Sequence, residues 1–386
     1  MTGADAMRYL DAVTPAALDA VLAEWRQGRP DMGVYAMLPE AEKSQVATLQ
    51  AACARAGVQL VGAIFPALLA GDGFVTRGVW LLRFDRMPFH LLRDELPQDA
   101  KQAAPCMREV SGELVAHLAD VPECTLFVVF DAMQPNIGTL LDELYLNLAN
   151  RVHYAGVNAG SETFQPMPCL FDGSRIIGGG ALFMLLPGHP GAVLEHGYRA
   201  PERTVYATAT EGNRIVQIDW RPAFEVYQEL VREQYGVEIR RDNFYELAVH
   251  FPFGIVRANH HVVVRIPVAL QDDGSLFCVG EVPANSLLTL LERPEVDTQE
   301  TLRVLEEGLR STAPAHVDGE LLLFYCAGRR MHLGLEQATA EVQAFQQRMP
   351  QTHIAGALSL GEIGSSTLHG YPLFHNATLV AMHWQA

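Results

Sequence analysis

The sequence predicts an α+β fold in two parts, with mixed and antiparallel sheets layered against helices. Up to residue 150, apolar runs of strand length alternate with amphipathic helical segments. Glycine-rich β segments with turn signals fill 152–218, and strands and helices alternate again beyond 243. Continuous apolar runs indicate strands that are covered on both faces, whereas short runs between glycines are typical of antiparallel hairpins.

The composition indicates a chain with a substantial core. Of 386 residues, 49% are hydrophobic and 19% are charged, which argues against disorder. The net charge of −17 repels phosphate groups and no basic stripe interrupts it, so neither nucleic acid nor an anionic membrane surface is expected as a partner. No apolar run has the length of a membrane span, and Asp5 and Asp11 lie where a signal peptide would be uncharged. A cytoplasmic location is therefore expected.

The six cysteines are widely separated in the chain, and no two form a C-x-x-C pair. This spacing predicts neither a zinc knuckle nor a thioredoxin-type motif. We expect reduced thiols that are mostly buried.

Residues 1–30 are predicted to be a helical leader. Thr14 is suited to cap a helix and Pro15 to occupy its first turn, and apolar residues then recur at helical spacing as far as Trp25. The first domain is placed at 31–235. Its predicted strands and helices alternate as far as residue 150 and give way to hairpins, and a last helix covers 223–233.

The second domain is placed at 236–386, because the polar and charged stretch 232–243 is suited to a boundary. A strand at 260–268 opens it, and helices and strands follow to a glycine-flanked turn at 361–364. Both halves combine apolar strands with amphipathic helices and end in such a turn. The similarity between the halves is too weak to predict a repeat.

The sequence lacks the motifs of the common enzyme classes. The nucleophile elbow, the H-E-x-x-H zinc motif, the phosphate-binding P-loop and the dinucleotide fingerprint are all absent. Gly178-Gly179-Gly180 lies in a β-rich run with no helix after it, so it does not form a phosphate cradle. We therefore expect a binding module and not an enzyme.

Several short motifs, taken in order, resemble the FIST domain family of bacterial sensory modules. In the first half they are Leu60-Val61-Gly62-Ala63, Phe127 to Asp131, Tyr154 to Gly160, Phe171-Asp172-Gly173, Gly178 to Ala181, Glu195 to Tyr198, and Glu211 to Val216. In the second half they are Asp273-Gly274-Ser275, Cys326 to Arg330, Gly361 to Gly364, and Phe374 to Thr378. The resemblance implies a FIST N-terminal and a FIST C-terminal domain that bind a ligand and report to a partner.

One departure from the family pattern concerns the turn AGVNAGSETF, which lacks the usual aspartate and carries an asparagine and Glu162. It is similar to a subgroup with a different ligand, the haem-binding, nitric-oxide-sensing FIST proteins. That resemblance implies haem b as cofactor and a stand-alone sensor that regulates a partner histidine kinase. A homodimer is compatible with it.

For haem, the loop from His189 to Tyr198 offers the candidate residues. No C-x-x-C-H motif is present, so noncovalent haem would need a neutral imidazole on iron and an apolar slot. His196 is the first candidate for the iron ligand and His189 the second, with Glu195 or Tyr198 placed to orient or shield the group. The alternative is that His196 caps a turn and hydrogen-bonds a carbonyl group.

A haem-free sensor is the second hypothesis. Arg329 and Glu362 each follow a predicted strand beside a glycine, and together they could clamp the carboxylate and ammonium groups of an amino acid. Cys326 and His375 lie near the same strand ends and complete this candidate site. The alternatives are that Cys326 is a packed thiol at a strand end and that His375 and Asn376 hold the final strand turn in place. The alternative for Arg329 and Glu362 is a structural ion pair.

Overall fold

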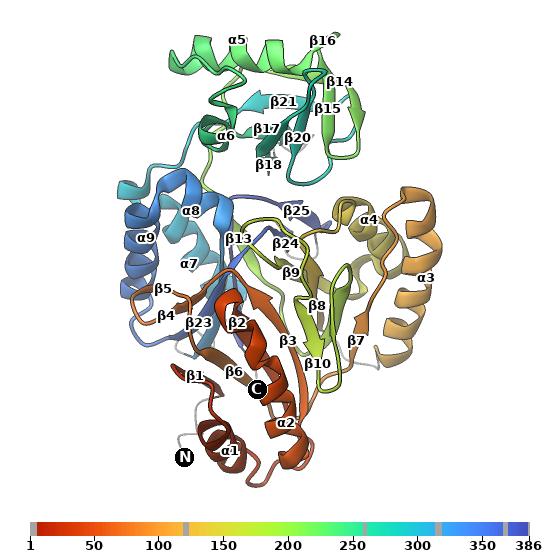
Figure 1. The fold of residues 1–386 in the computed structure, drawn as a ribbon, viewed down its shortest axis with the longest axis vertical. Coiled ribbons are helices and arrows are strands. Elements are labelled where there is room, and N and C mark those ends of the chain that lie inside the picture. The colour runs from red at the N-terminus through yellow and green to blue at the C-terminus, as the bar shows by residue number, and fades with distance from the viewer. Residues whose placement is uncertain (1–5, 119–122, 258–260, 313–318, 366–369, 385–386) are drawn as a thin grey trace.

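Three mixed sheets and one antiparallel sheet form the protein, which we describe from a computed structural model over residues 6–118, 123–257, 261–312, 319–365 and 370–384. The three mixed sheets make up a body, and the fourth sheet makes up a separate lobe, residues 199–292, which we call the β lobe (Figure 1). The predicted α+β class with mixed and antiparallel sheets is confirmed.

Each sheet of the body is built around a parallel strand pair. The pairs are β2 (Gly33–Pro39) with β3 (Gln59–Phe65), β8 (Cys124–Asp131) with β9 (His153–Ala159), and β22 (Glu320–Cys326) with β23 (His353–Ser359). A return strand runs antiparallel to the first strand of each pair: β6 (Val79–Phe84), β12 (Ala181–Pro187) and β26 (Leu379–Trp384). Beyond it lies an edge strand: β1 (Met7–Leu10), β7 (His90–Arg93) and β13 (Val193–Glu195).

The three sheets exchange strands in a closed cycle. A short strand follows each parallel pair but joins the sheet of another pair: β4 (Leu68–Ala70) pairs with β23, β10 (Leu170–Asp172) with β3, and β24 (Glu362–Gly364) with β9. Each is continued by a hairpin partner, namely β5 (Gly73–Val75), β11 (Ile176–Ile177) and β25 (Leu373–His375). The body is therefore a threefold repeat, which the sequence similarity was too weak to predict.

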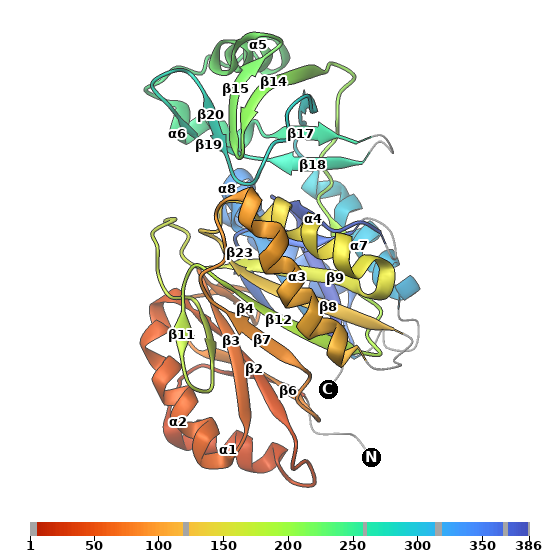
Figure 2. The ribbon, with the colours of Figure 1, turned by 90° about the vertical axis from the view of Figure 1, so that its right-hand side faces the viewer.

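Two helices cover the outer face of each sheet. They are α1 (Pro15–Trp25) and α2 (Val46–Ala56) on the first sheet, α3 (Ala100–His117) and α4 (Ile137–Leu148) on the second, and α7 (Glu300–Thr312) and α9 (Leu335–Arg348) on the third. Figure 2 shows α3 and α4 side by side over the second sheet. The short α8 (Ala327–Leu333) follows β22. As predicted, Thr14 caps α1, since its Oγ1 accepts the amide of Ala17 at 3.3 Å.

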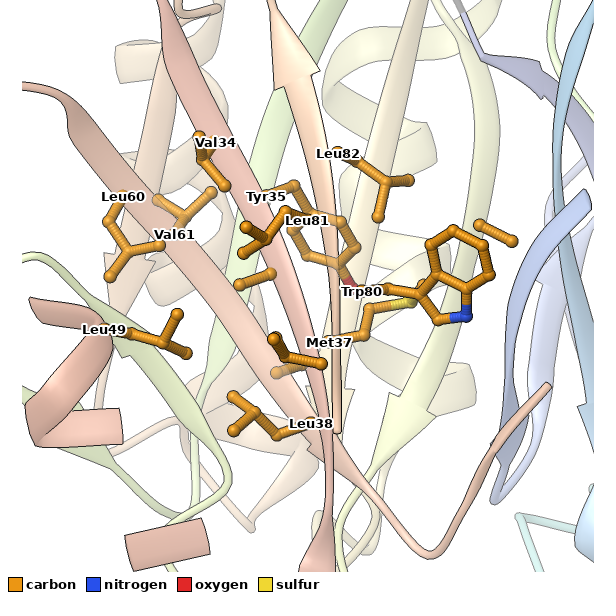
Figure 3. Packing of buried hydrophobic residues seen from close by; sticks show 14 of the residues in the cluster. Val34, Tyr35, Met37, Leu38, Leu49, Leu60, Val61, Trp80, Leu81 and Leu82 are labelled. Carbon is orange, nitrogen blue, oxygen red and sulfur yellow. The ribbon is translucent and has the colours of Figure 1, made fainter. Parts of the chain in front are cut away.

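The inner faces of the sheets form the main core. Figure 3 shows side chains packed on both faces of the first sheet, with Leu49 of α2 on the outer face that the helices cover. Aromatic rings from the three sheets meet deeper inside: the ring of Phe127 lies 5.9 Å from that of Tyr35 and 6.1 Å from that of Phe324. These residues come from β8, β2 and β22, so burial of aromatic area joins the three units into one body.

A single glycine marks the middle of the second parallel strand in each unit: Gly62, Gly156 and Gly356. A Cβ atom at any of the three would lie between 2.1 and 2.3 Å from the carbonyl oxygen of the residue paired with it on the first strand. Because no side chain tolerates such an approach, only glycine fits, and the repeat is visible in the sequence at this position.

The β lobe is inserted between β13 and α7 of the third unit. Its strands are β14 (Val205–Glu211), β15 (Arg214–Ile218), β16 (Arg221–Pro222), β17 (Phe253–Val256), β18 (Val262–Arg265), β19 (Pro267–Leu270), β20 (Leu276–Cys278) and β21 (Leu287–Leu290). Its helices are α5 (Ala223–Tyr235) and α6 (Phe244–Leu247). In its described part, the predicted strand 260–268 is thus divided into two strands, β18 and β19. The domain boundary that was predicted between residues 235 and 236 lies inside the lobe.

The chain enters and leaves the lobe at one place. Arg199 and Glu292 form an isolated antiparallel bridge, with N–O distances of 3.1 and 3.0 Å. Arg199 also pairs with the carboxylate of Glu295 at 2.8 Å. Gly197, just before the crossing, has φ of +68°, and a Cβ there would lie 2.0 Å from Oγ1 of Thr301. The crossing is thus narrow and depends on a glycine.

Candidate functional site

Two adjoining cavities of about 200 and 310 Å³ lie between the body and the β lobe. Phe164, Val268 and Val279 line both of them. The body contributes strand ends, since Asn158 is near the end of β9 and Cys326 ends β22. The lobe contributes β19, β20 and α6, and in Figure 1 α6 lies next to α8. Loops at strand ends that face a second lobe are a common place for ligands.

Each of the two cavities is lined by an asparagine whose side chain has an unpaired polar atom. Asn158 lines the larger cavity and Asn376 the smaller one, and each is only 1% exposed. Oδ1 of each side chain has no hydrogen-bond partner. The amide nitrogen of Asn376 donates to the carbonyl oxygen of His375 at 3.2 Å, which fixes its unpaired atom as an acceptor. An unpaired buried acceptor costs about 1–3 kcal/mol, so it calls for a partner supplied from outside the chain.

The predicted site residue His375 is fully buried beside Asn376, and both of its ring nitrogens lack partners. Burial holds the pKa of His375 well below its ordinary value, and the nearby His196 and Arg265 lower it further. The imidazole is therefore neutral. With one donor and one acceptor left open, it is a further polar group beside the cavities.

Among the described residues that line the two cavities, Glu162 is the one charged side chain. Its two carboxylate oxygens each accept a hydrogen bond of 2.6 Å from Arg330, whose guanidinium also lies 5.2 Å from the centre of the Phe74 ring. The charge of Glu162 is thus already compensated, and the remaining lining is neutral.

Arg329 and Glu362 do not form the predicted clamp. Arg329 is fully buried and makes a bidentate ion pair with Glu341 of α9, at 2.8 and 2.6 Å. Its remaining nitrogen donates to the carbonyl oxygen of His196 at 2.6 Å, and Tyr325 donates to the same Glu341 at 2.8 Å. Every nitrogen of the guanidinium is engaged, so Arg329 has a structural ion pair, with a partner that the sequence analysis did not single out.

Glu362 lies behind the smaller cavity, surrounded by short polar side chains. Ser359 donates to it at 2.5 Å, and the hydroxyl of Thr378 and the thiol of Cys326 also hydrogen-bond it. Burial raises the pKa of Glu362 to about 7, although these hydrogen bonds lower it. Burial also raises the pKa of Cys326, and the Glu362 carboxyl raises it further, so the thiol stays protonated and is a poor iron ligand.

His196 and His189 both use their two ring nitrogens within the protein. Nδ1 of His196 accepts the amide of Tyr198 at 2.9 Å, and Nε2 lies 3.2 Å from the carbonyl oxygen of Val262. These contacts match the alternative for His196, in which it caps a turn and hydrogen-bonds a carbonyl group. Nε2 of His189 lies 2.8 Å from the carbonyl oxygen of His383, and its Nδ1 accepts the amide of Gly191 at 3.1 Å. Burial lowers the pKa of His189 to about 4.

The surroundings of these histidines do not fit haem either. His189 is 2% exposed, and the hydroxyl of Tyr198 lies 2.6 Å from Nδ1 of His332. A depression that borders on Gly197 is lined by charged side chains, including Arg199 and Glu300, whereas a porphyrin needs apolar walls. In this conformation the predicted ligands do not fit the cofactor.

The repeat, the inserted lobe and the cavities occur in a chain that matches two family models in succession. The FIST N domain matches residues 33–221, and the FIST C domain matches 223–365. The chain belongs to the FIST family. FIST domains are sensory domains for small ligands in signalling. No curated protein matches the chain. Within the described ranges, no helix combines the length and the apolar character that a membrane crossing needs.

Neither asparagine was among the residues that the sequence analysis predicted to bind a ligand. Asn158 lies in the departing turn AGVNAGSETF and Asn376 follows His375, so both lay inside motifs that pointed to the family. Their roles depend on which polar atoms stay unpaired, and that is a property of tertiary structure. The one available signal was a polar residue near the end of an otherwise apolar strand.

Proposed function

We propose that this FIST protein is a sensor that binds a small organic ligand in the two cavities between the body and the β lobe. The observation that carries the proposal is the pair of buried, unpaired acceptors on Asn158 and Asn376. A ligand that pairs with them recovers hydrogen-bond energy that the empty cavities forgo. The mostly apolar lining with few polar groups is typical of a small-molecule site.

A ligand in this place would contact the body and the lobe at once. It would favour one position of the lobe over others, because contacts to both parts are made only when they are close. In this proposal the narrow crossing at Arg199 and Glu292 would act as the hinge of the lobe. The changed outer surface would then be read by a partner protein.

The test is a thermal-shift screen of small metabolites against wild type and Val268→Trp. Val268 lines both cavities and is only partly buried, so a tryptophan there fills the site with little strain. We expect hits on wild type to raise Tm by a few degrees and to lose at least about tenfold in affinity in the variant. Val237→Trp is the matched control, since Val237 is also partly buried but lines neither cavity. Hits that bind Val268→Trp undiminished would contradict the proposal.

Haem-based nitric oxide sensing and regulation of a histidine kinase stay predictions from the family resemblance. The hydrogen bonds of His196 and His189 speak against haem in this conformation. The visible absorption spectrum of the purified protein tests it directly. A strong absorption band in the blue that is lost in His196→Ala would restore haem as the ligand.

A further inference from the structure

We infer that the ligand of these cavities is uncharged, with an apolar body and an N–H or O–H donor such as a carboxamide. The inference rests on the proposed function and narrows it to a chemical class. It excludes the free amino acids for which Arg329 and Glu362 were considered. Charge, hydrogen bonding and the apolar lining each support it.

The charge of the lining excludes an anionic head group. No cationic side chain is among the described residues that line the cavities. Arg329 is held by Glu341, and Arg330 by Glu162. A carboxylate would therefore lose its hydration without gaining a cation, which is unfavourable in an apolar site.

A cationic head group is excluded by the same reasoning. Glu162 is the one carboxylate in the described lining, and both of its oxygens already accept from Arg330. Glu362 is buried behind Cys326, and its hydrogen bonds come from neighbouring hydroxyl and thiol groups. An ammonium group would have to break one of these arrangements to be paired.

Hydrogen bonding favours a donor on the ligand. The open atom of Asn376 is an acceptor, because its amide nitrogen is already used on the His375 carbonyl group. Asn158 lines the adjoining cavity, and its buried Oδ1 atom also has no hydrogen-bond partner. A carboxamide, with two donors and one acceptor, can satisfy either side chain, whereas a hydrocarbon leaves both unpaired.

The apolar side chains that line the cavities determine the chemical character of the remainder of the ligand. The side chains shared by the cavities are Phe164, Val268 and Val279, and Ile266 and Phe374 extend the apolar lining on the two sides. An apolar body, such as an aromatic ring or a short alkyl chain, is removed from water against these side chains.

The experiment uses three probes that share a ring and differ in charge: phenylacetamide, phenylacetate and 2-phenylethylammonium. Their affinities for the full chain are measured by calorimetry. We expect phenylacetamide to bind at least about tenfold more tightly than either ion. Asn376→Ala should weaken amide binding about tenfold, because it removes the acceptor. Asn147→Ala, at an exposed position on α4, is the matched control and should change nothing.

A gain-of-function variant protects the test against misfolding of Asn376→Ala. Val268→Lys adds a cation at a partly buried position of the lining, so it should bind phenylacetate more tightly than wild type does. Equal binding of phenylacetate and phenylacetamide to wild type would overturn the ligand class. Failure of all three probes would overturn it too, and the Val268→Trp screen would then show separately whether the cavities bind ligands at all.

Discussion

Glu362 shows how burial sets the chemistry of a single side chain in this protein. It was predicted to hold a ligand, but its carboxyl group is enclosed by Ser359, Thr378 and Cys326. Arg329, which was placed in the same candidate site, pairs with Glu341 instead. Glu341 and Glu362 both follow Arg329 in the chain, and their spacing does not indicate which of them pairs with it. The pairing depends on how α9 packs against β22.

The pKa of Glu362 predicts a pH-dependent stability. In the folded protein the pKa is about 7, above its ordinary value of 4.5. The folded state therefore binds the proton more tightly, and the stabilisation is complete below about pH 4.5 and is lost as the pH rises to about 7. Glu362→Gln should remove this part of the pH dependence, at most about 3 kcal/mol in the free energy of unfolding.

Chemical denaturation of wild type and Glu362→Gln between pH 5 and 8 measures this contribution. Buried histidines such as His189, whose pKa is lowered to about 4, act in the opposite direction, and the difference between the two curves removes their effect. The exposed Glu336→Gln serves as control. Parallel curves for wild type and Glu362→Gln would show that Glu362 does not titrate in this range.

At the scale of elements, the sequence predicted the strands better than their pairing. Apolar runs and helical periodicity located most strands and helices of the body, because both patterns are local. The exchange of β4, β10 and β24 between sheets was not predictable, since β4 and its partner β23 are far apart in the chain. The repeated strand glycine was visible, but its meaning depends on a neighbour in another part of the sequence.

The repeated glycine gives a prediction for one element. In Gly356→Ala, the new Cβ would lie 2.2 Å from the carbonyl oxygen of Leu323, so β22 and β23 must separate. We expect a loss of about 3 kcal/mol in the free energy of unfolding. Gly112→Ala, on the exposed side of α3 with nothing within 4 Å, should instead stabilise by about 0.5–1 kcal/mol. Equal effects of the two changes would contradict the packing described for the parallel pairs.

At the scale of the whole molecule, an insertion turns a symmetric body into an asymmetric one. The β lobe interrupts the third unit between β13 and α7 and lies next to strand ends of the second and third units. Only there do the cavities gain a second wall. The sequence indicated a change of pattern after residue 152 but not that the later hairpins belong to a separate lobe. An insertion is recognised only once the chain segments before and after it are seen to belong to the same sheet.

The most direct measurement of ligand binding in these cavities is NMR of protein labelled with ¹⁵N at asparagine. The side-chain amide signals of Asn158 and Asn376 are followed during titration with phenylacetamide. We predict that both signals shift with a common Kd, while that of Asn147 on α4 stays in place. Unchanged signals of Asn158 and Asn376 at saturation with a bound ligand would contradict the account.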